Sequence, residues 1–231
     1  MLSLDSHGTV QLLSVAKAAV VIALTACAMV QVRKPSRWLG RPFLWMMNLT
    51  HSRLTDWGLQ QIQIEDHFTI LDIGCGGGKT VRKLAGLAQA GKVYGVDYAK
   101  GSVAASRSAN SDFIQAGRVE IQDASVSRLP FPAEQFDLIT AVETQYYWPN
   151  LTDDMKEVRR TLKPGGTFVV IAETYAGHLT EKLLRPLMKL LRARTLSAAQ
   201  QRELFASAGY SDIRIVEERK RGWICAVGRK P

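Results

Sequence analysis

The stretch Thr69-Ile-Leu-Asp-Ile-Gly-Cys-Gly-Gly-Gly-Lys-Thr80 decides the fold of this chain. Its apolar beginning is typical of the end of a buried parallel strand, and residues 81–88 repeat apolar side chains at the period of a helix. Glycines fill most of the turn between the two. This arrangement can cradle a nucleotide, because glycine lets the backbone approach a ligand and the N–H groups of a helix start favour anionic or polar groups.

Three kinds of cradle compete for this pattern. The dinucleotide fingerprint G-x-G-x-x-G fails because Lys79 stands where the third glycine belongs. The phosphate loop G-x-x-x-x-G-K-[ST] ends correctly at Thr80, but Ile73 occupies the position of its first glycine. The pattern that fits is Asp-x-Gly-x-Gly-x-Gly, which runs from Asp72 to Gly78.

Composition limits the class of protein. A chain of 231 residues that is 46% hydrophobic can bury one sizeable core, so we expect a single main domain. The net charge of +9 suits an acidic partner, either nucleic acid or anionic lipid, but it equally serves solubility. The cysteines Cys27, Cys75 and Cys225 are scattered and lack metal-ligand spacing. We therefore expect a reduced, cytoplasmic protein without disulfides and without a bound metal.

The amino end carries a strongly apolar segment. Residues 1–34 are predicted to form a helix outside the main domain, which spans residues 35–231. The apolar run at residues 12–32 reaches the length of a membrane span only if Lys17 is tolerated near one end. The positive charges from Arg33 onward would keep an anchored domain on the cytoplasmic face, and they argue against a secretory signal. Membrane anchor and soluble packing helix both remain open.

The rest of the chain alternates short apolar stretches with helical patterns, which predicts an α/β fold with a doubly wound sheet. Further strands are expected at residues 91–97, 118–123, 136–143, 167–173, 212–217 and 223–228. Helices are expected at residues 99–115, 155–162, 177–195 and 197–208. Thr152 and Ser197 are predicted N-caps, and Pro186 should kink its helix or mark its first turn. Val103, Ala104, Ala105 and Phe113 are expected to face inward.

Acidic side chains fall at the carboxyl ends of four neighbouring predicted strands. They are Asp72, Asp97, Asp123 and Glu143. Ligands of a doubly wound sheet bind beyond these strand ends, so we expect the acids to surround one site. Asp97 follows the glycine turn by about 20 residues, where nucleotide-binding folds place an acid on the ribose hydroxyls.

These motifs resemble those of the class I S-adenosylmethionine-dependent methyltransferases, of the small-molecule type (methyltransferase domains 11 and 25), over about residues 48–229. Further motifs that carry the resemblance are Asp123-Ala124 with Leu129-Pro-Phe131, and Leu162-Lys-Pro-Gly-Gly166. The resemblance implies a Rossmann-like, doubly wound, seven-stranded sheet with an antiparallel last strand, here with an N-terminal helical extension. It also implies S-adenosyl-L-methionine as cofactor. The cofactor-binding residues implied are Asp72, Gly74, Cys75, Gly76, Gly78, Asp97, Tyr98, Asp123, Ala124 and Glu143.

The segment after the fourth strand, residues 143–150, lines the methyl group and the acceptor in this family. It is not the Asn/Asp-Pro-Pro-aromatic motif of amino-directed nucleic-acid methyltransferases, so no nucleic-acid partner is expected. We interpret Tyr146, Tyr147 and Trp148 as the wall of a small-molecule pocket, although one or two of them could serve packing alone. The candidates for a general base are Glu143, His51 and Tyr147, in that order.

The function that the sequence favours is methyl transfer from S-adenosylmethionine to O, N, C or S of a small or lipophilic molecule. The acceptor pocket is expected between residues 48–51, 143–148 and 177–195. Two alternatives remain open: a nucleic-acid or protein methyltransferase, and a non-catalytic protein that binds S-adenosylmethionine. Membrane contact is expected through residues 12–32. The helix expected at residues 177–195 is interpreted as a lid with a solvated basic face, and a surface for anionic lipid is the alternative. The sequence indicates neither the identity of the acceptor nor the oligomeric state.

Overall fold

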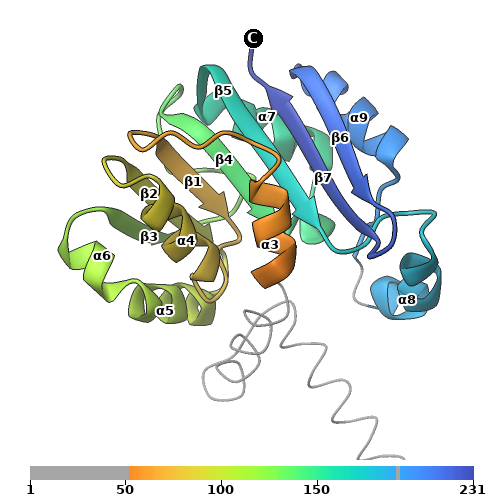
Figure 1. The fold of residues 1–231 in the computed structure, drawn as a ribbon, viewed down its shortest axis with the longest axis horizontal. Coiled ribbons are helices and arrows are strands. Elements are labelled where there is room, and N and C mark those ends of the chain that lie inside the picture. The colour runs from red at the N-terminus through yellow and green to blue at the C-terminus, as the bar shows by residue number, and fades with distance from the viewer. Residues whose placement is uncertain (1–51, 191–192) are drawn as a thin grey trace, which may run out of the picture.

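The computed structural model describes residues 52–190 and 193–231. Seven strands form one sheet in the order β3-β2-β1-β4-β5-β7-β6 (Figure 1). The strands are β1 (Thr69–Ile73), β2 (Lys92–Asp97), β3 (Val119–Asp123), β4 (Phe136–Val142), β5 (Leu162–Ala172), β6 (Ser211–Glu218) and β7 (Trp223–Arg229). The helices are α3 (Ser52–Leu59), α4 (Lys79–Leu87), α5 (Lys100–Ala109), α6 (Ser111–Gln115), α7 (Leu151–Thr161), α8 (Leu179–Leu190) and α9 (Ala198–Ser207), with a 3₁₀ turn η1 (Gln145–Tyr147).

The predicted topology is confirmed. Strands β1 to β5 pair in parallel, and β7 inserts antiparallel between β5 and β6. The predicted N-terminal helical extension, residues 1–34, lies outside the described residues and stays a prediction. None of the helices in residues 52–190 and 193–231 combines the length and apolar character that a membrane crossing requires.

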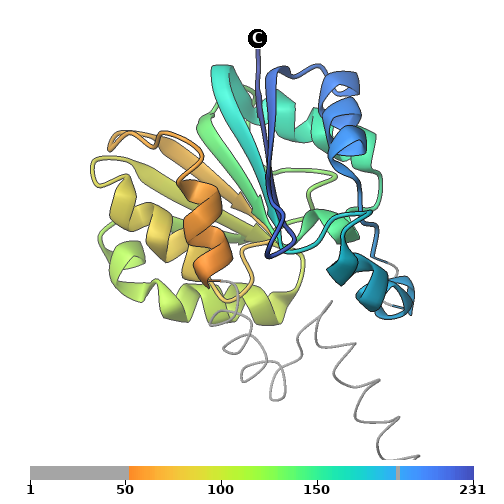
Figure 2. The same ribbon diagram turned by 45° about the vertical axis from the view of Figure 1, so that its right-hand side comes forward.

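Helices cover both faces of the sheet (Figures 1 and 2). Because side chains of a strand alternate between faces, Ile70 and Leu71 of β1 enter two different hydrophobic clusters. The cluster of Ile70 contains the buried side chains of α3, α4 and α5, whereas that of Leu71 contains those of α7 and α9. The sheet is therefore buried on both sides, as expected for a parallel sheet with crossover helices.

The expected helix at residues 99–115 is two helices. Asn110 separates α5 from α6, and its side-chain amide donates to the carbonyls of Ser106 and Gly78 at 2.9 and 3.0 Å. An asparagine that bonds to nearby backbone in this way competes with the helical ladder. The inward orientation expected for Ala104 is wrong, because Ala104 is exposed.

Other boundaries also move. α7 begins at Leu151, so Thr152 lies inside the helix and is not its cap. Asp154 instead accepts the N–H of Asn150 at 2.9 Å and closes the first turn. Pro186 lies inside α8, away from its first turn. The predicted cap of α9 is confirmed: Ser197 and Gln200 form a reciprocal capping box.

Two helical glycines test the packing of this fold. A Cβ at Gly58 in α3 would overlap the side chain of Ile171 on β5, whereas a Cβ at Gly86 in α4 would meet nothing within 4 Å. We expect Gly58→Ala to lower the free energy of unfolding by about 1–3 kcal/mol through overpacking. Gly86→Ala should raise it by up to about 1 kcal/mol, because alanine is the better helix former. Urea denaturation measures both. Equal effects of the two substitutions would contradict the packing of α3 on β5.

Candidate functional site

The site lies where the order of the strands reverses. From β1 the chain moves outward through β2 and β3, then returns to β4 on the other side of β1. A crevice forms at the carboxyl ends of two such strands because their following segments leave in opposite directions. Here the two segments are the glycine turn after β1 and the loop after β4. They touch, since a Cβ on Gly74 would overlap the side chain of Thr144.

The backbone of the glycine turn is fixed by its own hydrogen bonds. The N–H groups of Gly74 and Cys75 both donate to the carbonyl of Val96, at 2.8 and 3.0 Å. That of Gly78 donates to the carbonyl of Cys75 at 2.8 Å. The sequence suggested amides directed at a ligand, but these amides fasten the turn to β2 and to itself.

Gly78 needs to be glycine for two reasons. Its φ is +81°, and a Cβ there would approach Asn110 Nδ2 and Ser106 Oγ to 2.5 Å. The side chain of Cys75 is buried in the core on the side of Ile70. Burial, reinforced by the charges of Asp97 and Asp72, raises the pKa of its thiol well above the ordinary value. Cys75 therefore serves this site as backbone and not as a thiolate.

Asp97 joins β2 to the glycine turn. One carboxylate oxygen accepts the N–H of Gly76 at 3.0 Å, and the other accepts the N–H of Ala99 at 2.8 Å. The residue is only 8% exposed. Burial raises the pKa of this carboxyl, while the two backbone N–H groups oppose the rise. The arrangement holds an acid, fixed in direction, at the rim of the turn.

Asp72 lies deeper, in β1. It is 2% exposed, and the hydroxyl of Thr140 on β4 donates to its carboxylate at 2.7 Å. Burial raises the pKa of Asp72 to about 7 despite this hydrogen bond, and the neighbouring charge of Asp97 adds to the rise. Asp72 thus lies beneath the turn as an acid that titrates near neutrality.

The other residues that the sequence predicts to bind the cofactor differ in their placement. Asp123 stands opposite Asp97 in the register of β2 and β3, and its side chain is exposed. Tyr98 is 50% exposed and follows Asp97 in sequence. The N–H of Ala124 donates to the main-chain carbonyl of Asp97 at 3.2 Å, so this amide continues the ladder between the strands. One edge of the sheet therefore carries the side chains of Asp97, Tyr98 and Asp123. The amide of Ala124 is instead hydrogen-bonded within the protein.

Glu143 follows β4 with φ of +57°, a left-handed conformation that is uncommon for residues other than glycine. Its carboxylate oxygen Oε1 accepts the N–H of Glu173 at the end of β5 and lies 3.2 Å from the hydroxyl of Tyr146. The same hydroxyl lies 3.2 Å from the carbonyl of Thr174. Burial and the charge of Glu143 raise the pKa of Tyr146, so the phenol stays protonated and fixes the carboxylate.

Two of the three aromatics predicted to form the pocket wall, Tyr146 and Trp148, are buried, which agrees with the alternative that one or two of them serve packing. Trp148 is 5% exposed and stacks on Phe168 at a centroid distance of 6.1 Å, so it belongs to the core. Tyr146 is buried in the hydrogen-bond network, and Tyr147 is half-buried with its ring against that of Tyr146. Tyr147 is the aromatic of this segment that keeps an accessible face. His51, the second candidate base, lies outside the described residues.

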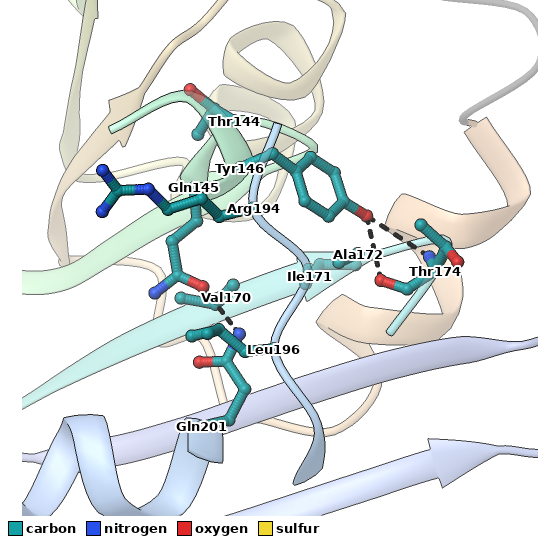
Figure 3. Close-up of a pocket in the computed structure, with 10 residues that line it drawn as sticks. All are labelled: Thr144, Gln145, Tyr146, Val170, Ile171, Ala172, Thr174, Arg194, Leu196 and Gln201. Atoms are coloured by element: carbon teal, nitrogen blue, oxygen red, sulfur yellow. Dashed lines mark hydrogen bonds between the residues drawn. The ribbon is translucent and has the colours of Figure 1, made fainter. Parts of the chain in front are cut away.

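A small cavity lies beneath this loop (Figure 3). Its volume of about 10 Å³ suits one water molecule. The lining residues are Thr144, Gln145, Tyr146, Val170, Ile171, Ala172, Thr174, Arg194, Leu196 and Gln201. Gln201 donates to the side-chain carbonyl of Gln145 at 2.6 Å, and its own Oε1 is buried without a partner among the described residues. A water in the cavity would satisfy that oxygen.

The segment before α9 closes over the loop after β4. The N–H of Arg194 donates to the carbonyl of Tyr146 at 2.9 Å, and the N–H of Ala176 donates to that of Leu196 at 3.1 Å. Two of the stretches expected around the acceptor, residues 143–148 and 177–195, are therefore in contact. The third, residues 48–51, lies outside the described part of the chain.

Sequence reasoning missed several residues that build the site. Thr140 could have been noticed, because a threonine interrupts an otherwise apolar part of its strand. Thr144, Asn110 and Gln201 gave no signal, since their roles depend on contacts with distant segments. Within the described residues, no group of three or more histidine, cysteine or acidic side chains is arranged to hold a metal ion.

Comparisons with known proteins agree with this geometry. A family model described as a methyltransferase domain matches residues 71–170. Sterol 4-C-methyltransferase strm-1 of Caenorhabditis elegans is 32% identical over 111 residues, which cover 48% of this chain and 33% of the relative. O-methyltransferase cnsE of Penicillium expansum is 29% identical over 153 residues, which cover 65% of this chain and 55% of the relative. The chain thus spans about a third to a half of these relatives.

The fold is also similar to solved structures. One is described as the "complex between the Haloferax volcanii Trm112 methyltransferase activator and the putative methyltransferase". It superposes with a TM-score of 0.73 at 20% identity, over 84% of this chain and 96% of that one. At this identity the likeness concerns the fold.

The titration of Asp72 should be visible in stability. Because folding raises its pKa from the ordinary 3.8 to about 7, the folded state binds more protons than the unfolded state between these values. The ligand-free wild type should therefore lose stability relative to Asp72→Asn as pH rises from about 4 to about 7, by on the order of 4 kcal/mol. Urea denaturation at several pH values measures the difference.

A second variant should raise the pKa of Asp72 further. Thr140→Val removes the hydroxyl that lowers the pKa of Asp72, so the loss of stability should extend to higher pH. A difference between wild type and Asp72→Asn that does not change with pH would show that Asp72 is ionised throughout the range.

Proposed function

Because the chain belongs to the class I S-adenosylmethionine-dependent methyltransferases, we propose that it transfers the methyl group of S-adenosylmethionine to a small, lipophilic acceptor. The matched region contains the end of β1, the glycine turn and the acids of β2 and β3. Support for a small acceptor comes from the relatives, one named for a sterol and another as an O-methyltransferase.

The observation that carries the proposal is the hydrogen bond between Gly76 and the buried carboxylate of Asp97. A carboxylate whose pKa is raised by burial is stabilised in its charged form by hydroxyl donors, and the two hydroxyls of a ribose supply such donors. Beside it, a Cβ on Gly76 would find no atom nearer than the carbonyl of Gly74 at 3.9 Å, so a ligand can approach the backbone there. The residues present fit the cofactor.

S-adenosylmethionine, when bound, supplies a methyl group that is already activated on a sulfonium. The protein then needs mainly to align the acceptor, exclude water and, for some acceptors, remove a proton. Glu143 is the first candidate for the base, and the Tyr146 hydroxyl and the Glu173 N–H fix its carboxylate. Tyr147 borders the acceptor side. The segment around Arg194 covers the loop that carries both.

The proposal is tested by supplying radiolabelled S-adenosylmethionine to the purified chain together with a cell extract that contains lipids, proteins and nucleic acids. Label should enter the organic phase with the wild type and stay at background with Asp97→Ala. Label recovered in protein or nucleic acid, or absent from every fraction, would refute the small lipophilic acceptor.

Asp97→Ala should weaken the binding of S-adenosylmethionine by about 1.5–3 kcal/mol, as expected for a lost hydrogen bond to a charged group. Titration calorimetry measures the effect. Asp66→Ala removes an exposed acid that precedes β1, away from the carboxyl ends of the strands, and should leave the affinity unchanged. Tight binding of NADH or ATP by the wild type, without any response to S-adenosylmethionine, would contradict the cofactor assignment.

Two tyrosines should separate cofactor binding from methyl transfer. Tyr147→Ala should lower the rate of label transfer while the dissociation constant of S-adenosylmethionine stays within about threefold. Tyr98→Ala, next to Asp97, should instead raise that dissociation constant. A large loss of cofactor affinity in Tyr147→Ala would place Tyr147 in the cofactor site, and an unchanged rate would remove it from the acceptor pocket.

A further inference from the structure

Helix α8 displays apolar side chains to the outside. Among the described residues, the exposed large hydrophobic side chains are Leu87, Tyr98, Leu179 and Leu190. The last two belong to α8 and are the most exposed, at 66% and 64%. Leu179 and Leu190 stand three turns apart and therefore on one side of the helix, since each residue turns it by about 100°. Pro186, between them on the same side, is exposed as well.

The opposite side of α8 faces the protein. Met188 packs against the cluster formed by Tyr146, Ala172, Tyr175 and Ile224, and Glu181 is 4% exposed. By helical geometry, Met188 points about 180° away from Leu179. One side of α8 therefore already packs against the domain, and Leu179 and Leu190 lie on the opposite side. They contribute little to the packing of the domain.

Basic side chains border the outer leucines. Lys182 and Lys189 are exposed and lie about 60–80° around the helix from Leu179. Arg185, next to them, is exposed and paired with Glu181 at 3.0 Å. An apolar stripe with lysines along one side is the pattern of helices that lie in a membrane interface, where the apolar side chains enter the acyl boundary and the lysines meet anionic headgroups. The net charge of +9 favours the same partner.

The helix is fastened at both ends beside the site. His178 lies directly before α8, and its Nε2 is 2.8 Å from the carbonyl of Arg219. Beyond the other end, the N–H of Arg194 donates to the carbonyl of Tyr146. α8 lies at the edge of the sheet where the parallel strands end (Figures 1 and 2). Its outer side therefore belongs to the part of the molecule that also carries Glu143 and Tyr147.

We propose that the outer side of α8, formed by Leu179, Lys182, Pro186, Lys189 and Leu190, rests on an anionic phospholipid surface. The contact sets the acceptor side of the molecule against the membrane. It goes beyond the proposed function, because it requires only lipid binding and no particular reaction.

A fluorescent probe on this surface tests the contact in the full chain. Leu190→Cys, combined with Cys27→Ser, is labelled with an environment-sensitive dye, since Cys75 and Cys225 are buried. Leu87→Cys in the same background is the matched control, because Leu87 is an exposed leucine on α4. Vesicles of phosphatidylglycerol and phosphatidylcholine should shift the emission of the probe at position 190 to the blue, and leave the probe at position 87 unchanged.

The other outcomes overturn the proposal. No shift at position 190, or an equal shift with pure phosphatidylcholine, would exclude an anionic surface as the partner. A probe already shielded before vesicles are added would show that another part of the chain, or a second copy, covers α8. Binding through residues 12–32 alone would bring the protein to the vesicles without a shift at position 190.

Charge removal gives a second measurement. Lys182→Ala with Lys189→Ala should weaken vesicle binding about thirtyfold, because each basic residue at an anionic surface contributes about fivefold. Arg128→Ala with Lys156→Ala removes two exposed charges elsewhere and should change it much less. If both double variants lost vesicle binding equally, the effect would come from net charge alone, and the proposed role of α8 would be wrong. Calorimetry with S-adenosylmethionine on the same variants keeps a failure of this proposal distinct from a failure of the proposed function.

Discussion

The arrangement of the site depends on one hydrogen bond, from the N–H of Gly76 to the carboxylate of Asp97. It connects the turn after β1 with the end of β2, two segments that neighbour each other only through the parallel pairing of their strands. The amides of Gly74 and Cys75 reinforce the connection by sharing the carbonyl of Val96. Because these bonds hold the turn in place before any ligand arrives, little ordering remains to be done when one binds.

The same connection concentrates acids in a small, poorly solvated volume. Burial raises the pKa of both Asp72 and Asp97; the charge of Asp97 adds to the rise at Asp72, and that of Asp123 adds to the rise at Asp97. Such crowding opposes the stability of the fold and is tolerated where a ligand gains from it. A ligand that carries hydroxyl donors and a positive sulfonium relieves both the desolvation and the repulsion. The acids therefore couple ligand binding to the stability of the strand ends.

The sequence sufficed for features that arise within one segment. The turn from Asp72 to Gly78 and the cap at Ser197 were predicted because backbone conformation and local hydrogen bonds select their residue types. Features that need a second segment were missed or wrong. Asn110 breaks a helix because it reaches Gly78, and Trp148 leaves the acceptor wall because Phe168 offers it a stacking partner. The amide of Ala124 likewise donates to the carbonyl of Asp97 in the neighbouring strand β2.

The insertion of β7 between β5 and β6 has a consequence for biosynthesis. β7 follows β5 and β6 in the chain, and its side chains from Ile224 to Val227 are buried. Until this strand has been made, the edge of β5 that pairs with β7 is unpaired in the nascent protein. The sheet can close only after β7 has been made, so a nascent chain that still lacks this strand exposes a backbone edge that chaperones recognise and that aggregation would exploit.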